Sequence, residues 1–283
     1  MRLATNLGTS FERRGRSTSC CGPKSPGHSV RPMDLAGSTV LVTGGAIRIG
    51  RSIACAMAER GATVVITFRS SAHEAQTAVA EIEANGGTAY AIRLDLEDAA
   101  SIPAAVGEAV AAAGPIDVLV NNASYFEPTP FPTDVHAGWF RTFDVLVHGP
   151  YLLSNAVAPG MLERGRGSII NIVDLSAWHP WPDRGAHSVA KSALLALTRQ
   201  LAVELAPAVT VNAIAPGPTI PATSFDADQI DRLARRNLLG KWGDPAEIAR
   251  TAVFLAEASN ITGDCITVDG GERWGHVRAR FAD

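Results

Sequence analysis

Short apolar segments alternate with longer amphipathic stretches along most of the chain. The apolar segment at 38–42 (Ser-Thr-Val-Leu-Val) precedes a helical pattern at 51–60, in which Ile53, Ala54 and Met57 share one face. Apolar runs of this length are typical of strands buried on both sides in a parallel sheet. The patterns predict strands at 38–42, 63–67, 89–94, 116–120, 168–173, 209–214 and 265–268, and helices at 51–60, 72–85, 99–113, 139–163, 187–205 and 244–257.

This alternation predicts one α/β domain over 33–283, a doubly wound Rossmann domain with a parallel seven-stranded sheet flanked by helices. Ligands of such sheets bind at the carboxyl ends of the strands. Residues 218–243 look irregular and are predicted to form a lid over the substrate. Residues 1–32 are rich in Arg, Ser, Gly and Pro, and we expect a disordered leader there, with a targeting segment as the alternative.

Composition narrows the classes of function that the chain can have. The chain has 283 residues, of which 46% are hydrophobic, and its formal net charge of −3 gives no sign of a nucleic-acid partner. No apolar run reaches the roughly 18 residues of a membrane span. Neither the cysteines nor the histidines have metal-ligand spacing, so we expect no metal and a reduced, cytoplasmic setting. The four cysteines are Cys20, Cys21, Cys55 and Cys265.

A glycine-rich turn at 43–50 joins the first predicted strand to the first predicted helix. Gly44 and Gly50 allow a sharp turn and close packing of the helix. The free N–H groups at the start of the helix then face an anion. A strand, a glycine turn and a helix in this order predict a site for the pyrophosphate of a dinucleotide, and a plain turn is the alternative.

From about residue 35 to 275 the chain resembles the short-chain dehydrogenase/reductases. The resemblance rests on several separate motifs: Thr43-Gly44 with Gly50, Asp95-Leu96, Asn121-Asn122-Ala123, Lys191, Asn212, Pro216-Gly217, and Gly263 with Asp269-Gly270. Four further residues resemble the pteridine reductase and dihydromonapterin reductase branch: Arg48, Ser124, Phe126 and Asp174.

The end of the second strand predicts the choice of cofactor. It reads Phe68-Arg69-Ser70, without the acid that selects NAD. Arg69 can bind a 2′-phosphate, with Ser70 and Arg48 beside it, so we predict NADPH; a solvated arginine is the alternative. The resemblance implies that Asp95 accepts a hydrogen bond from the adenine, unless it only begins a helix. The full set of predicted cofactor residues is Gly44, Arg48, Ile49, Gly50, Phe68, Arg69, Ser70, Asp95, Leu96, Asn122, Ala123, Ser124, Lys191, Pro216 and Gly217.

The catalytic residues depart from the family pattern. The family has a tyrosine four residues before its lysine, and here His187 precedes Lys191. Leu146 stands where the family has an asparagine. An imidazolium has an ordinary pKa of about 6.5 and could act as the acid. Lys191 should lower that pKa and Asp174 should raise it, and the sequence leaves both this balance and a passive wall role for His187 open.

Asp174 offers a second route for the proton. In the resembled branch this carboxylate helps to protonate a ring nitrogen, often through water, which would suit a C=N bond. The alternative for Asp174 is a capping residue after the fifth strand. The predicted catalytic residues are therefore Asp174, His187 and Lys191. The predicted substrate residues are Ser124, Phe126, Trp178 and Trp181, although the tryptophans could instead pack a subunit interface or the lid.

Together these features predict an NADPH-dependent reductase of a small molecule. The expected substrate is a dihydropterin, dihydrofolate or similar C=N or C=O compound. A catalytically silent NADP-binding homologue, acting as a redox sensor or partner subunit, is the alternative that His187 and Leu146 favour. The resemblance also implies a homotetramer.

Overall fold

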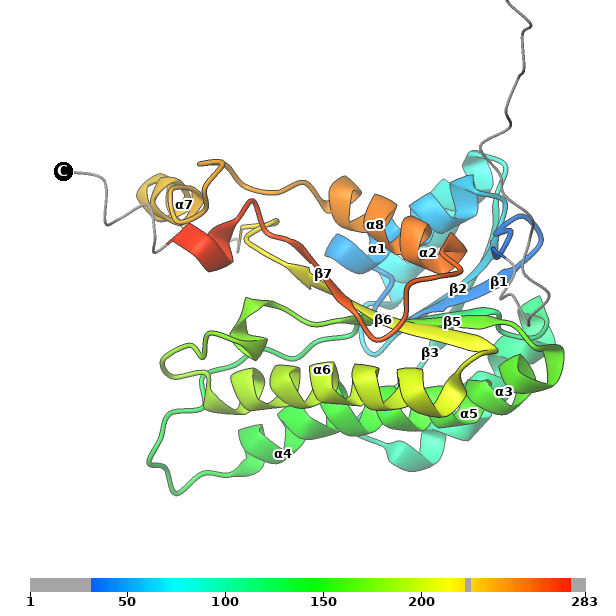
Figure 1. Ribbon diagram of the computed structural model, residues 1–283, viewed down its shortest axis with the longest axis horizontal. Helices are drawn as coiled ribbons and strands as arrows, with labels where there is room; N and C mark the ends of the chain where they lie inside the picture. Colours follow the sequence, from blue (N-terminus) through cyan, green and yellow to red (C-terminus); the bar gives the residue numbers. More distant parts are fainter. Residues whose placement is uncertain (1–31, 222–224, 276–283) are drawn as a thin grey trace, which may run out of the picture.

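The computed structural model describes residues 32–221 and 225–275. Its centre is a seven-stranded parallel sheet with the strand order β3-β2-β1-β4-β5-β6-β7, which confirms the predicted fold class (Figure 1). The strands are β1 (Thr39–Val42), β2 (Thr63–Phe68), β3 (Thr88–Arg93), β4 (Val118–Asn121), β5 (Gly167–Ile172), β6 (Val209–Pro216) and β7 (Cys265–Val268).

Helices cover both faces of this sheet (Figure 1). In β1, Val40 and Val42 pack in the cluster that contains α1, α2 and α8, while Leu41 packs in the opposite cluster with α3 and α5. Because successive side chains of a strand point to opposite faces, the uninterrupted apolar run of β1 fills both clusters. The helices are α1 (Arg48–Glu59), α2 (Ala72–Ala84), α3 (Ile102–Ala113), α4 (Ala137–Phe143), α5 (Gly149–Arg164), α6 (Gly185–Leu205), α7 (Ala227–Ala234) and α8 (Pro245–Glu257).

The helix predicted at 139–163 is interrupted. Between α4 and α5 the backbone forms a π-helical turn over Asp144–His148. Pro150 follows this turn and has no N–H to donate to the carbonyl four residues earlier, so the regular hydrogen-bond ladder cannot continue there. The structure thus corrects one long helix to α4, a π-helical turn and α5.

The segment 218–243 contains a helix that the sequence analysis missed. Asp226 accepts a hydrogen bond from the backbone N–H of Gln229, whose side chain accepts one from the N–H of Asp226. This capping box begins α7 and was a readable signal. The segment is therefore partly helical, and its role as a lid stays a prediction.

Of the proposed leader 1–32, residues 1–31 lie outside the described part of the chain. Among the helices of the described residues, none has the length and apolar character needed to cross a membrane.

Candidate active site

The turn between β1 and α1 has the geometry of an anion site. Gly44 has a φ of +61°, and a Cβ atom at Gly50 would lie 2.3 Å from the carbonyl oxygen of Gly44. Ile47, which precedes α1, gives the helix no side-chain cap, and the first turn of α1 contains no acid. The N–H groups at this helix end therefore have no competing side-chain acceptor.

Asn122 fixes this turn to the end of β4. Its Nδ2 donates to the carbonyl oxygens of Thr43 and Gly44, at 2.9 and 3.1 Å. The hydroxyl oxygen of Thr43 in turn accepts hydrogen bonds from the backbone N–H groups of Asn122 and Ala123, at 2.9 and 3.0 Å. Thus β1, β4 and the glycine turn are joined at the point where the strand order reverses, which is where such sheets bind ligands.

A cavity of about 960 Å³ extends from this turn along the carboxyl ends of the strands. Its lining brings together all fifteen residues predicted to hold the cofactor, together with Asp174, His187, Phe126 and Trp181. The contacts with a cofactor themselves stay predictions.

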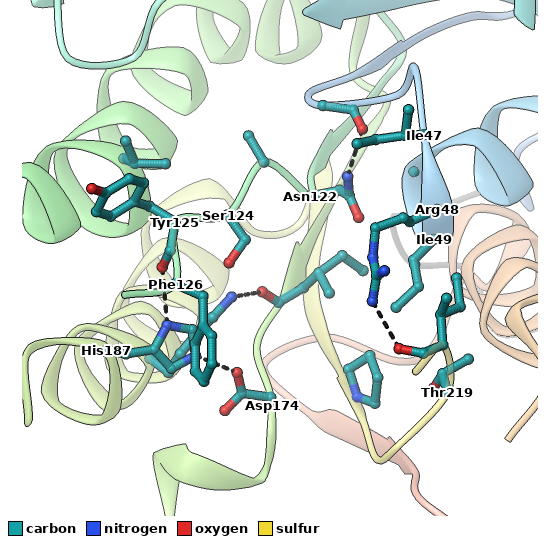
Figure 2. Close-up of a pocket in the computed structure, with 18 of the residues that line it drawn as sticks. Ile47, Arg48, Ile49, Asn122, Ser124, Tyr125, Phe126, Asp174, His187 and Thr219 are labelled. Carbon is teal, nitrogen blue, oxygen red and sulfur yellow. Dashed lines mark hydrogen bonds and ion pairs between the residues drawn. The ribbon is translucent and has the colours of Figure 1, made fainter. Parts of the chain in front are cut away.

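The two arginines of the predicted phosphate site have partners within the chain. Arg69, half exposed, forms an ion pair with Glu97, which also pairs with Arg141. Arg48 has a φ of +54°, and its guanidinium donates to the carbonyl oxygen of Ile220 at 2.8 Å. Arg48 is therefore directed at the segment after β6 (Figure 2). Its predicted place beside the 2′-phosphate stays a prediction.

His187 and Asp174 form a buried pair (Figure 2). His187 Nε2 lies 2.7 Å from Asp174 Oδ2, and His187 Nδ1 lies 3.2 Å from the backbone carbonyl oxygen of Tyr125. The other carboxylate oxygen of Asp174 accepts hydrogen bonds from the N–H and the hydroxyl of Ser176. Asp174 lies two residues after the end of β5, and His187 lies in the first turn of α6, so two neighbouring elements bring the pair together.

The surroundings of Asp174 favour its ionised form. Burial opposes ionisation of Asp174, but the hydrogen bond from His187, the nearby charge of Lys191 and the hydrogen bond from Ser176 lower its pKa to about 2. The carbonyl oxygen of Tyr125 and the ionised carboxylate can both accept a hydrogen bond from the imidazole ring. The two contacts therefore hold the ring of His187 between two acceptors.

Lys191 lies one helical turn after His187, on the same face of α6. It is 3% exposed, and its Nζ donates to the carbonyl oxygen of Ile172 at 2.7 Å. Burial lowers the pKa of Lys191, and the charge of Asp174 opposes that effect. Lys191, His187 and Asp174 therefore share one electrostatic environment at the end of β5.

Leu146 lies in the π-helical turn and is 1% exposed in the apolar core. It offers no polar group where the resemblance implies an asparagine. Tyr125 and Ser176 were missed by the sequence analysis, although both hold the pair. Tyr125 acts through its backbone carbonyl, which no residue type reveals, whereas a serine two residues after an aspartate is a visible capping signal.

Aromatic rings surround His187. Phe126 meets it edge to face at 4.8 Å between ring centres, and Trp181 stacks on it at 6.0 Å. The structure contradicts the predicted place of Trp178, which packs against the core cluster of Val173 and Leu194 and does not line the cavity. The sequence could not show which tryptophan faces the cavity, because the loop after β5 has no regular hydrophobic periodicity.

Comparison with known proteins agrees with this geometry. A family model described as enoyl-(acyl carrier protein) reductase matches residues 45–272. The chain is 32% identical over 251 residues to 2-dehydro-3-deoxy-D-gluconate 5-dehydrogenase of Formosa agariphila, covering 86% of this chain and 95% of that protein.

Two solved structures extend the comparison. The first, FolM alternative dihydrofolate reductase 1 from Brucella canis complexed with NADP, is 35% identical, with a TM-score of 0.81 over 85% of this chain and 96% of that one. The second, a Serratia marcescens short-chain dehydrogenase/reductase variant, is 32% identical, with a TM-score of 0.78 over 85% and 99% of the two chains. The chain therefore belongs to the short-chain dehydrogenase/reductase family of NAD(P)-dependent oxidoreductases.

Proposed function

We propose that this protein is an NADPH-dependent reductase of a pteridine, such as a dihydropterin or dihydrofolate, or of a similar C=N or C=O compound. The observation that carries the proposal is the 2.7 Å contact between His187 Nε2 and Asp174 Oδ2, which lies in the cavity that begins at the glycine turn. A reductase needs both a dinucleotide site and a proton donor, and this cavity provides candidates for both.

The residues of the cavity fit a phosphorylated dinucleotide. The uncapped start of α1 can bind the pyrophosphate, and the absence of a Cβ at Gly50 leaves the close approach that this requires. Arg69 and Ser70 can hold the 2′-phosphate, and Lys191 the ribose of the nicotinamide. When bound, NADPH supplies the hydride. NADP in the crystal structure of the Brucella canis relative supports this choice of cofactor.

The proton leaves the pair through Asp174. Both ring nitrogens of His187 are engaged, and its side chain is 4% exposed, whereas that of Asp174 is 17% exposed. The proton on His187 Nε2 passes to Asp174 Oδ2, and Asp174 passes it to the substrate nitrogen or oxygen, directly or through a water. His187 then remains neutral and keeps the hydrogen bond to the carbonyl of Tyr125. The low pKa of Asp174 means that the carboxyl group holds the proton only briefly.

A planar heterocycle is the substrate that the lining favours. Phe126 and Trp181 provide aromatic surface beside the pair, and Ser124 adds a hydroxyl. The resemblance to the pteridine reductase branch, with His187 in place of the tyrosine, and the name of the Brucella canis relative point the same way. The name of the Formosa agariphila relative, which refers to a sugar acid, keeps other carbonyl substrates in the proposal.

The test is the oxidation of NADPH by the purified protein with 7,8-dihydrobiopterin and with dihydrofolate, followed by absorbance. We expect turnover that Asp174→Ala abolishes while NADPH still binds. Turnover that survives Asp174→Ala would remove the pair from the reaction. Tight NADPH binding without oxidation across a pterin and carbonyl panel would overturn the reductase proposal.

A second candidate function rests on Leu146 and His187. Their positions suggest a catalytically silent NADP-binding homologue that acts as a redox sensor or as a partner subunit. It would bind NADPH without turnover, and His187→Tyr would produce activity.

We further propose a cytoplasmic homotetramer. Exposed Tyr151 and Val203 on α5 and α6 support an assembly surface, which light scattering of the purified protein can test.

A further inference from the structure

Two charged residues of the cavity have no part in the proposed cofactor and proton chemistry. Arg236 lies just after α7, and Glu272 begins a short 3-10 turn after β7. Both line the cavity, and Arg236 Nε lies 3.3 Å from Glu272 Oε1. The other charged lining residues already have proposed roles, namely Arg48, Arg69, Asp95, Asp174, His187 and Lys191.

The two members of this ion pair differ in exposure. The side chain of Glu272 is 13% exposed, and that of Arg236 is 56% exposed. Burial raises the pKa of Glu272, while the charge of Arg236 opposes that rise. A guanidinium has five N–H donors in a planar fork, and Glu272 engages its Nε edge. In the described ranges Arg236 has no second side-chain partner, so its outer N–H groups can bind another acceptor.

Apolar side chains from the same segment line the cavity as well. They are Leu233, three residues before Arg236, and Trp242. The Nε1 of Trp242 donates to the carbonyl oxygen of Ile230 at 2.9 Å, which fixes the ring. The segment after β6 therefore supplies this part of the cavity with both apolar surface and a cation.

We propose that Arg236, held in position by Glu272, binds a carboxylate of the substrate. The inference rests on the proposed reductase function and narrows its substrate class. A pterin with an acidic tail, such as dihydrofolate, is favoured over 7,8-dihydrobiopterin, which has no carboxylate. Arg236 is a specificity-determining residue in this arrangement, and Glu272 is its positioning residue.

The test compares folate and biopterin binding to the NADP-saturated protein by titration calorimetry. Arg236→Gln should weaken folate binding about tenfold or more, the usual effect of losing a hydrogen bond to a charged group, and leave biopterin binding within about twofold. Arg236→Lys should restore part of the affinity for folate. Arg235→Gln is the matched control, because Arg235 is 76% exposed, pairs with Asp231 and does not line the cavity.

Equal binding of folate by the wild type and Arg236→Gln would overturn the inference, and so would equal weakening of both ligands. In the latter case Arg236 would only hold the segment in place. NADPH oxidation is measured on the same proteins. If neither dihydropterin is reduced but the Arg236-dependent preference for folate persists, the proposed reaction fails and the carboxylate site stands. If the wild type binds both ligands equally, the carboxylate site fails, whatever the turnover.

Discussion

The two ends of the cavity are built from different parts of the chain. At the cofactor end the backbone dominates, through the N–H groups of α1 and the close approach at Gly50. At the proton-transfer end three groups from separate segments meet. They are the side chains of Asp174 and His187 and the backbone carbonyl of Tyr125. The first end depends on local backbone geometry, and the second depends on the identity of single residues.

This difference explains where the chain departs from its family. The glycine turn and the end of β4 match the family motifs, whereas His187 and Leu146 do not. The proton-transfer end lies after β5 and at the start of α6, outside the ladder of the sheet, so a side chain there can be exchanged without removing a hydrogen bond between strands. The two ends should therefore respond separately to substitution.

His187→Gln should have the largest effect, and only at one end. The amide of glutamine cannot pass a proton to Asp174 as an imidazole can, so we expect the rate of NADPH oxidation to fall about 10²- to 10⁴-fold, as when a general acid is lost. The dissociation constant for NADPH, measured by fluorescence, should stay within about twofold.

If His187→Gln weakened NADPH binding as strongly as it lowered turnover, the two ends of the cavity would not respond separately, and the comparison would fail. Retained turnover would instead assign the proton to a group other than this pair. Ser192→Ala serves as a control on the same helix, because within the described residues its hydroxyl donates to the backbone carbonyls of Ala177 and Ser188 and to no side chain.

The same contrast governs what could be predicted from the sequence. The seven strands, most of the helices and the glycine turn were predicted because hydrophobic periodicity and glycine positions are local signals. The sequence also singled out Asp174 and His187, but not their contact, which depends on how β5 and α6 pack. The carbonyl of Tyr125 could not be predicted, because every residue has one.

The segment after β6 was the least predictable. Its helix α7 has a capping box at Asp226 and Gln229 but is only 8 residues long, and Ala234 is its one buried residue, so it adds little apolar sequence from which a helix could be predicted. The place of Arg236 beside Glu272 depends on the return of the chain after β7, far along the sequence. Charged residues brought together by long-range packing leave no pattern in either segment alone.

Arg69→Ala should act at the opposite end and with a smaller effect. Loss of one charged contact with the 2′-phosphate should raise the dissociation constant for NADPH about tenfold, and leave that for NADH within about twofold. The maximal rate at saturating NADPH should not change. Arg51→Ala provides the matched control, because Arg51 pairs with Glu81 and does not line the cavity. If NADPH and NADH lose affinity alike, Arg69 does not bind the 2′-phosphate.

The smallest expected effect concerns the stability of the fold rather than turnover. It tests whether the hydrogen bond from His187 lowers the pKa of Asp174. The pKa of Asp174 is lowered from 3.8 to about 2 in the folded protein. A lowered carboxyl pKa stabilises the fold above the unfolded value, and this stabilisation is lost as the pH falls from 3.8 toward 2. The shift corresponds to about 2 kcal/mol.

Urea unfolding of the wild type and of Asp174→Asn at a series of pH values measures this contribution. The wild type should be the more stable at pH 6, and roughly half of the advantage should be gone at pH 3. In the His187→Gln background the dependence should shrink, because the hydrogen bond from His187 is the main cause that lowers the pKa of Asp174. A dependence that is unchanged in that background would mean that Lys191 and Ser176 alone stabilise the carboxylate, and that His187 is only a neighbour of Asp174.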